Sequence, residues 1–234
     1  MTNEIDFETY LYISSKKIKI FVRNEFEQKD YYIKEFFLND IEENENSVIL
    51  DNFLKENIFK IEKIIDTFVK NITLIIEDKN LIDIKFSIKK ENFGNILISK
   101  NLNHSLNDLK NIFVENYKYY KIIHMVIEKY IIDNIEYVSF PKELNCNYFS
   151  LDVKFICLPD YFFKNFEDNL KKYQIKIKQV VSENYVNNFF NDDGTNIFSN
   201  VKKIQNGSNP NEILFLDKIQ KNKGFFEKFF HFFS

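Results

Sequence analysis

The apolar pattern of the first third of the chain constrains the fold most, because one long helical stretch lies among strand patterns. Apolar side chains recur every three or four positions from Asp51 to Lys70, which predicts a helix with Asp51 as its N-cap. Tyr10–Arg23 and Asp30–Leu38 precede it and predict three strands, and the apolar run Asn71–Ile76 predicts a fourth. Three strands, a helix and a strand open a layered fold of the α+β (α/β) class.

The remainder of the chain also alternates between strand and helix patterns. Further predicted strands are Leu81–Lys90, Asn95–Ser99, Lys121–Asp133, Ile135–Val138, Phe149–Leu158 and Ile175–Val181. One helix is predicted from Asn103 or Ser105 to about Tyr117, and another from Asp160 to about Tyr173. Asn191–Pro210 is rich in Asn, Asp, Gly and Ser, which predicts a linker.

Glycine is scarce in this chain, and that scarcity bears on function. The four glycines form neither GxGxxG nor GxxxxGK. Nucleotide phosphates are usually held by glycine-rich turns, where backbone N–H groups approach the ligand closely. We therefore expect a non-catalytic protein that needs no cofactor, rather than a nucleotide-hydrolysing enzyme.

Charge, cysteine and histidine content exclude further classes. The net charge of −3 gives no reason to expect nucleic-acid binding. Cys146 and Cys157 have no CxxC spacing, and the three histidines are scattered, so we expect neither a disulfide framework nor a metal site. His124, inside a strand-like run, is expected to be structural. We expect no signal peptide and no membrane-spanning helix, because the N-terminal residues carry no apolar run and no apolar stretch approaches ~20 residues.

Lys223–Ser234 is strongly amphipathic. On a helix its phenylalanines would fill one arc of roughly 160°; they are Phe225, Phe226, Phe229, Phe230, Phe232 and Phe233. Such a helix lies in the membrane interface with its apolar face buried, and Lys223 and Lys228 would add attraction to anionic lipid. The alternative is a terminal helix that docks on the protein's own core.

The order of these patterns resembles the N-terminal third of the bacterial cell-division protein FtsA, an actin-like protein with an inserted SHS2-type subdomain called 1C. The stretch from Asn95 reads NILISKNLNHSLNDLKNIF and resembles the family's strand and first 1C helix. The stretch from Ile122 reads IIHMVIEKYIIDN, and the one from Leu151 reads LDVKFICLPDYFFKNFEDNLKKYQIKIKQVV. Both resemble later parts of 1C. SVILDNFLKENIFKIEKII, from Ser47, resembles the first helix of subdomain 1A. An amphipathic membrane helix after a linker is also a trait of the family.

The chain departs from the family at the first phosphate loop. Where FtsA carries Asp-x-Gly-Thr, this chain has Tyr12, Ile13, Ser14 and Ser15, so the carboxylate that would help to hold metal-bound phosphates is replaced. The second phosphate loop and domain 2 have no counterpart here. We therefore expect a degenerate loop that binds no nucleotide.

The resemblance implies five parts. They are a partial actin-like 1A-type subdomain (1–90), an SHS2/1C-like subdomain (91–174), a return strand and helix (175–190), a flexible linker (191–220) and an amphipathic membrane-targeting helix (221–234).

The function that the resemblance implies is a non-catalytic adaptor of the divisome, peripheral to the cytoplasmic face of the inner membrane at the mid-cell septum. Its partners would be the lipid surface and later division proteins of the FtsN type, with self-association through 1C also open. Two alternatives remain open at this stage. They are an actin-like protein with residual ATP binding, and a pilus-assembly scaffold of the PilM type.

Overall fold

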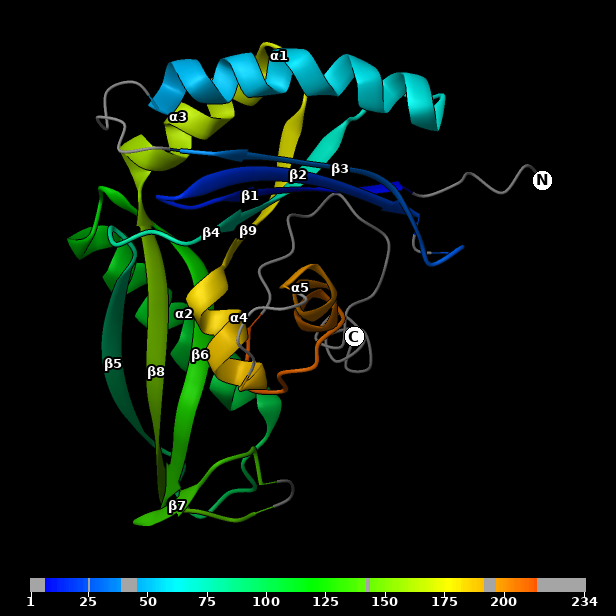
Figure 1. Cartoon of the computed structure of the whole chain (residues 1–234). Helices are drawn as coiled ribbons and strands as arrows, with labels where there is room; N and C mark the ends of the chain where they lie inside the picture. The colour runs from blue at the N-terminus through cyan, green and yellow to red at the C-terminus, as the bar shows by residue number, and fades with distance from the viewer. Residues whose placement is uncertain (1–6, 25, 39–45, 142–143, 192–196, 214–234) are drawn as a thin grey trace. The chain divides into compact units, whose positions relative to one another are not determined.

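The computed structural model describes residues 7–24, 26–38, 46–141, 144–191 and 197–213. These residues form two compact units. The first contains the described residues of 7–80 and 159–200, and the second contains the described residues of 81–158 and 201–213. Figure 1 shows the elements of both.

The first unit is built on a five-stranded sheet in the order β3-β2-β1-β4-β9. Its strands are β1 (Phe7–Ile13), β2 (Lys17–Asn24), β3 (Lys29–Phe37), β4 (Asn71–Ile76) and β9 (Lys176–Ser182). β1, β2 and β3 form an antiparallel meander, whereas β4 is parallel to both β1 and β9. Three antiparallel strands followed by two parallel strands are the arrangement expected of an actin-like subdomain. The predicted mixed α and β fold class is therefore confirmed.

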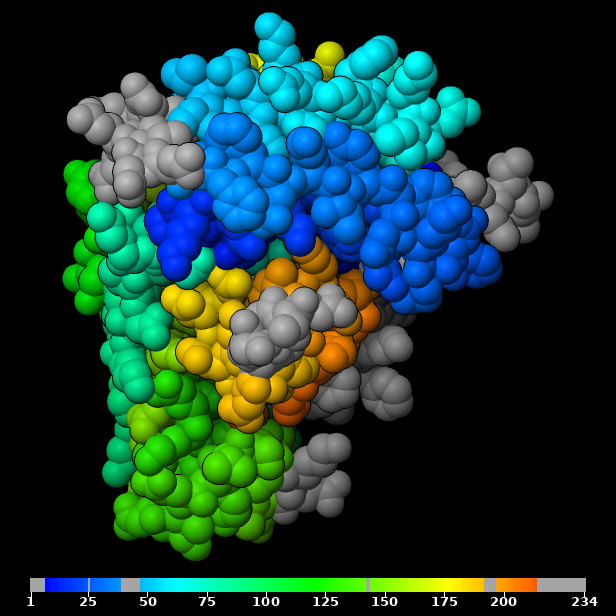
Figure 2. Space-filling view, viewed as in Figure 1, coloured from blue at the N-terminus to red at the C-terminus, as the bar shows by residue number. Residues whose placement is uncertain are grey.

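Two helices of this unit, α1 (Asn46–Ile65) and α3 (Asp160–Lys171), lie side by side and cover one face of the sheet (Figure 1). Lys172 just after α3 makes an ion pair with Asp51 of α1 at 3.1 Å, and Tyr173 donates a hydrogen bond to the backbone oxygen of Asp51. α4 (Glu183–Phe190) follows β9 directly. In the space-filling view α1 and β3 form a continuous outer surface of this unit (Figure 2).

The second unit has a four-stranded sheet in the order β5-β8-β6-β7. Its strands are β5 (Ile82–Glu91), β6 (Tyr120–Ile132), β7 (Ile135–Tyr137) and β8 (Tyr148–Pro159), and its helix is α2 (Ser99–Asn116). α2 buries Leu102, Leu106, Leu109 and Phe113 in the core that the sheet provides. The chain order strand, helix, strand, strand, strand fits an inserted SHS2-like unit.

Several boundaries differ from the prediction, including the start of α2, which lies at Ser99 and not at Asn103 or Ser105. α1 begins at Asn46, so Asp51 lies inside it and is not its N-cap, and α1 ends at Ile65 because Asp66 adopts a left-handed φ of 52°. The predicted strand Asn95–Ser99 is reduced to one isolated bridge between Ile96 and Asn145. The inserted unit spans residues 81–158 rather than 91–174, because β5 pairs with β8 while α3 packs beside α1.

The predicted flexible linker 191–220 is wrong for residues 197–213. Residues Ile197–Gln205 form α5, whose Ile197, Val201 and Ile204 are buried. The ring of Phe198 stacks on that of Phe21 with centroids 4.4 Å apart. Apolar burial at this helical spacing stabilises the segment despite its polar composition.

After α5 the chain adds a short pairing to β6. The backbone N–H of Ile127 donates a hydrogen bond to the backbone oxygen of Asn211 at 2.9 Å. The backbone N–H of Ile213 donates to the backbone oxygen of Met125 at 2.8 Å. Beside this pairing, Nδ1 of His124 lies 2.6 Å from a carboxylate oxygen of Glu212, with both side chains buried. The structural role predicted for His124 fits this contact, which holds the segment 211–213 against β6.

Candidate functional site

The carboxyl ends of the three parallel strands meet at one edge of the five-stranded sheet. In open α/β sheets this edge is where ligands bind. Tyr12 lies near the end of β1, Glu77 directly follows β4, and Glu183 is the first residue of α4 directly after β9. Strand pairing brings the three positions together, since Tyr12 is opposite Ile75 and Ile76 is opposite Ser182.

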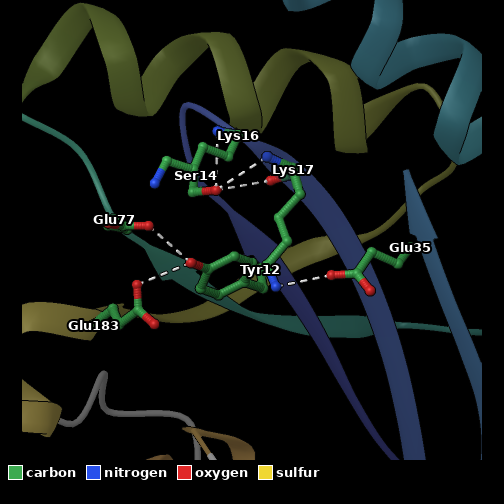
Figure 3. Close-up of polar contacts among 7 residues, drawn as sticks. All are labelled: Tyr12, Ser14, Lys16, Lys17, Glu35, Glu77 and Glu183. Atoms are coloured by element: carbon green, nitrogen blue, oxygen red, sulfur yellow. Dashed lines mark hydrogen bonds and ion pairs between the residues drawn. The ribbon is translucent and has the colours of Figure 1, made fainter. Parts of the chain in front are cut away.

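Tyr12 is the centre of this cluster (Figure 3). Its hydroxyl lies 2.9 Å from Oε2 of Glu183 and 3.0 Å from Oε2 of Glu77. A phenol has one proton to donate, so the two carboxyl groups converge on a single donor. The Tyr12 side chain is buried, whereas both glutamates are half-buried.

Burial sets the protonation of the cluster. It raises the pKa of Tyr12 far above its usual range, and the hydrogen bond and charge of Glu183 raise it further, so the phenol stays neutral. Burial also raises the pKa of Glu183, and the neighbouring Glu77 carboxylate acts in the same direction. The cluster is therefore a protonated phenol that holds two acidic groups together.

The turn that joins β1 to β2 is closed on itself by Ser14. Ser14 Oγ accepts hydrogen bonds from the backbone N–H groups of Lys16 and Lys17, at 3.2 and 3.1 Å. The N–H of Ser14 donates to the backbone oxygen of Lys17 at 2.9 Å. These are the donors that a phosphate loop would aim at a ligand. In this chain they are used inside the turn.

The lysine nearest the cluster is also engaged. Nζ of Lys17 forms an ion pair with Glu35 of β3 at 2.8 Å and lies 5.7 Å from the centre of the Tyr12 ring. It thus bridges the turn and the edge strand.

The nucleotide that an actin-like fold implies does not fit these residues. The position that needs a metal-directed carboxylate carries a neutral, buried phenol, and that phenol is held by Glu77 and Glu183. The turn has no glycine, and its donors at Lys16 and Lys17 are satisfied by Ser14. Among the described residues, no three His, Cys, Asp or Glu side chains lie close enough together to hold a metal ion.

The structure places the four predicted loop residues at one turn. Tyr12 and Ser14 are buried, Ile13 is half-buried and Ser15 is exposed. The predicted membrane-binding residues Lys223, Phe225, Phe226, Lys228, Phe229, Phe230, Phe232 and Phe233 lie outside the described residues. In the part that is described, no helix is both long and apolar enough to cross a membrane.

Sequence reasoning missed Glu77 and Glu183, which complete the cluster. Glu77 directly follows Ile76, the last residue of β4, and Glu183 directly follows Ser182, the last residue of β9. Parallel strands of one sheet end at a shared edge. An acidic residue directly after each of two such strands therefore indicates a candidate site at that edge. Only the pairing of β4 with both β1 and β9 shows that the two acids meet at Tyr12.

Comparison with known proteins gives structural likenesses only. Neither a protein-family model nor a curated protein sequence matches the chain. A structure of the PilM-PilN type IV pilus biogenesis complex matches with a TM-score of 0.48 and 8% identity, over 78% of this chain and 49% of that one. The cytoplasmic domain of EpsL, an inner membrane component of the type II secretion system of Vibrio cholerae, matches with a TM-score of 0.37 and 13% identity, over 77% and 57%.

A third likeness is to a Bacteroides thetaiotaomicron protein with an actin-like ATPase fold and unknown function. Its TM-score is 0.35 and its identity 10%, over 80% of this chain and 57% of that one. The chain thus spans about half the length of each of these three solved structures. The actin-like arrangement rests on the order and directions of the strands in the five-stranded sheet.

Proposed function

We propose that this protein is a non-catalytic, membrane-tethered adaptor of bacterial cell division, of the kind that the resemblance to FtsA implies. The observation that carries the proposal is the Tyr12 cluster. A buried phenol joined to Glu77 and Glu183 replaces the carboxylate that an actin-like ATPase needs at the end of β1. The actin-like unit then serves as a rigid support and not as an ATPase.

The tether in this proposal is the C-terminal amphipathic segment. Burying about half of each of its six phenylalanines in the interface would contribute a few kcal/mol before ordering costs, at ~1.5–3 kcal/mol per fully buried side chain. One such helix binds reversibly, so firm attachment at the inner membrane needs self-association or a second membrane-bound partner.

The tether is tested by sedimentation of the full chain with vesicles that contain phosphatidylglycerol. Phe229→Glu with Phe230→Glu should abolish pelleting, because two charges would enter the apolar face. Phe26→Glu with Tyr119→Glu is the matched control, since both side chains are more than four-fifths exposed in the structure. Equal pelleting of the tail variant and the unchanged chain would reject the tether.

The partner of the adaptor is proposed to be a division protein of the FtsN type, bound through the inserted SHS2-like unit. This unit has its own sheet and its own core, with α2 packed on it. It therefore has the parts of a self-contained recognition module. Self-association through the same unit is also part of the proposal.

The second candidate is a scaffold of pilus assembly or secretion. The PilM-PilN complex and the EpsL domain are assembly components whose structures resemble this chain in arrangement. The fold does not separate the two candidates, but localisation does. A fluorescent fusion that forms a mid-cell band supports the division adaptor, whereas polar or scattered foci support the assembly scaffold.

A further inference from the structure

A groove lies on the first unit beside the C-terminal half of α1. It is formed by α1, by the segment that leads from α1 into β4, and by the residues that follow α3. Its volume is about 470 Å³. The Tyr12 cluster contributes no residue to it.

The groove has an apolar floor and aromatic walls. Ile58 and Val69 are buried and form the floor, whereas Phe59 and Phe68 are 73% and 77% exposed. The left-handed residue Asp66 ends α1, and the chain beyond it turns Val69 into the core and leaves Phe68 at the surface. A single exposed apolar side chain is ordinary, but two phenylalanines along one groove mark a surface suited to a partner.

The rim of the groove is basic. Lys55, Lys70 and Lys172 line it, against Glu62 as the one acidic lining residue. Glu62 accepts a hydrogen bond from the backbone N–H of Val69 at 3.1 Å, and it therefore braces the groove wall. Lysines outnumber acids in the lining by three to one, which favours a negatively charged occupant.

We propose that this groove binds an acidic peptide segment of a partner protein that carries an aromatic or aliphatic anchor residue. The anchor packs between Phe59 and Phe68 over Ile58, and its flanking carboxylates face Lys55 and Lys70. A concave site with a buried apolar floor accepts an inserted anchor side chain. Lys172 already forms an ion pair with Asp51. Its positive charge therefore attracts the peptide at a distance, but we expect no direct ion pair between Lys172 and the peptide.

This site goes beyond the proposed adaptor function. It lies on the actin-like unit, whereas the proposed division partner binds the SHS2-like unit and the membrane binds the tail. If the tail variant still sediments with vesicles, the tether is rejected but the groove proposal is not affected. If the groove binds no acidic peptide, the groove proposal is rejected but the tether is not affected.

The test is selection from a library of short random peptides against the immobilised full chain, followed by fluorescence anisotropy with the enriched peptides. We expect enriched peptides to be net acidic and to share one large apolar residue. Phe59→Ala with Phe68→Ala, and separately Lys55→Glu with Lys70→Glu, should each weaken binding about tenfold or more. Enrichment of neutral or basic peptides, or none, overturns the proposal.

The matched control is Lys60→Glu with Lys63→Glu, which makes the same charge change on exposed residues of α1 that do not line the groove. This variant should retain binding within about threefold, since its charges lie off the contact surface. If the control variant and the lysine variant of the groove lose peptide affinity equally, the effect is due to net charge alone and the site is rejected. Loss of vesicle sedimentation with unchanged peptide affinity in the groove variants would assign the surface to lipid and also reject it.

Discussion

Tyr12 and Glu183 are 171 residues apart in the sequence, yet the phenol of one donates a hydrogen bond to the carboxylate of the other at 2.9 Å. The contact exists because β1, β4 and β9 run parallel and end at one edge of the sheet. It connects the first strand of the actin-like unit to the helix that follows its last strand. Tyr12 is therefore a structural joint between the end of β1 and the start of α4.

Tyr12→Phe should destabilise the first unit. The variant keeps the ring but removes the hydroxyl that both Glu77 and Glu183 approach, so two half-buried carboxyl groups lose their shared donor. We expect the free energy of unfolding to fall by about 1–3 kcal/mol in urea titrations. Tyr31→Phe removes an exposed tyrosine–glutamate hydrogen bond and should cost much less than Tyr12→Phe. Equal costs for the two variants would mean that the cluster is not a joint.

Glu183 should make stability fall as the pH rises. Its pKa is raised in the folded protein above the ordinary value of 4.5, so between those two values the folded state binds more protons than the unfolded state. The free energy of unfolding therefore decreases as the pH increases through that window. Glu183→Gln cannot titrate and should show a flatter profile in urea titrations at a series of pH values, with Glu136→Gln on exposed β7 as background. A profile for Glu183→Gln as steep as that of the unchanged chain would contradict the role of burial.

Glu212→Ala should loosen the segment that follows α5. The buried His124 would lose its 2.6 Å contact, and the pairing of Ile213 with Met125 would lose its neighbouring anchor. We expect a loss of about 1–3 kcal/mol in the free energy of unfolding, with faster hydrogen exchange at the amide of Ile213. Glu136→Ala breaks an exposed ion pair with Lys129 and should cost much less than Glu212→Ala. Unchanged exchange at Ile213 would show that the buried pair does not hold the segment.

The sequence predicts long periodic elements of this chain well and the Tyr12 cluster only in part. Phe149–Leu158 alternates clearly and is the core of β8, because one face of the sheet is buried by α2. The end of α1 could not be placed, since the apolar stripe continues through Phe68 and Val69 while the backbone turns at Asp66. Sequence reasoning missed α5 because its polar composition outweighed its three buried apolar positions, although Ile197, Val201 and Ile204 have helical spacing. Glu77 and Glu183 meet only through strand order, which local patterns do not contain.

Calorimetric titration of the full chain with ATP in the presence of Mg²⁺ tests the central claim most directly. With the phenol of Tyr12 held by Glu77 and Glu183, and with the N–H groups of Lys16 and Lys17 held by Ser14, we predict no saturable heat of binding. Saturable, Mg²⁺-dependent binding of ATP that is lost when residues of the Tyr12 cluster are changed would contradict the account. It would indicate a nucleotide-binding actin-like protein.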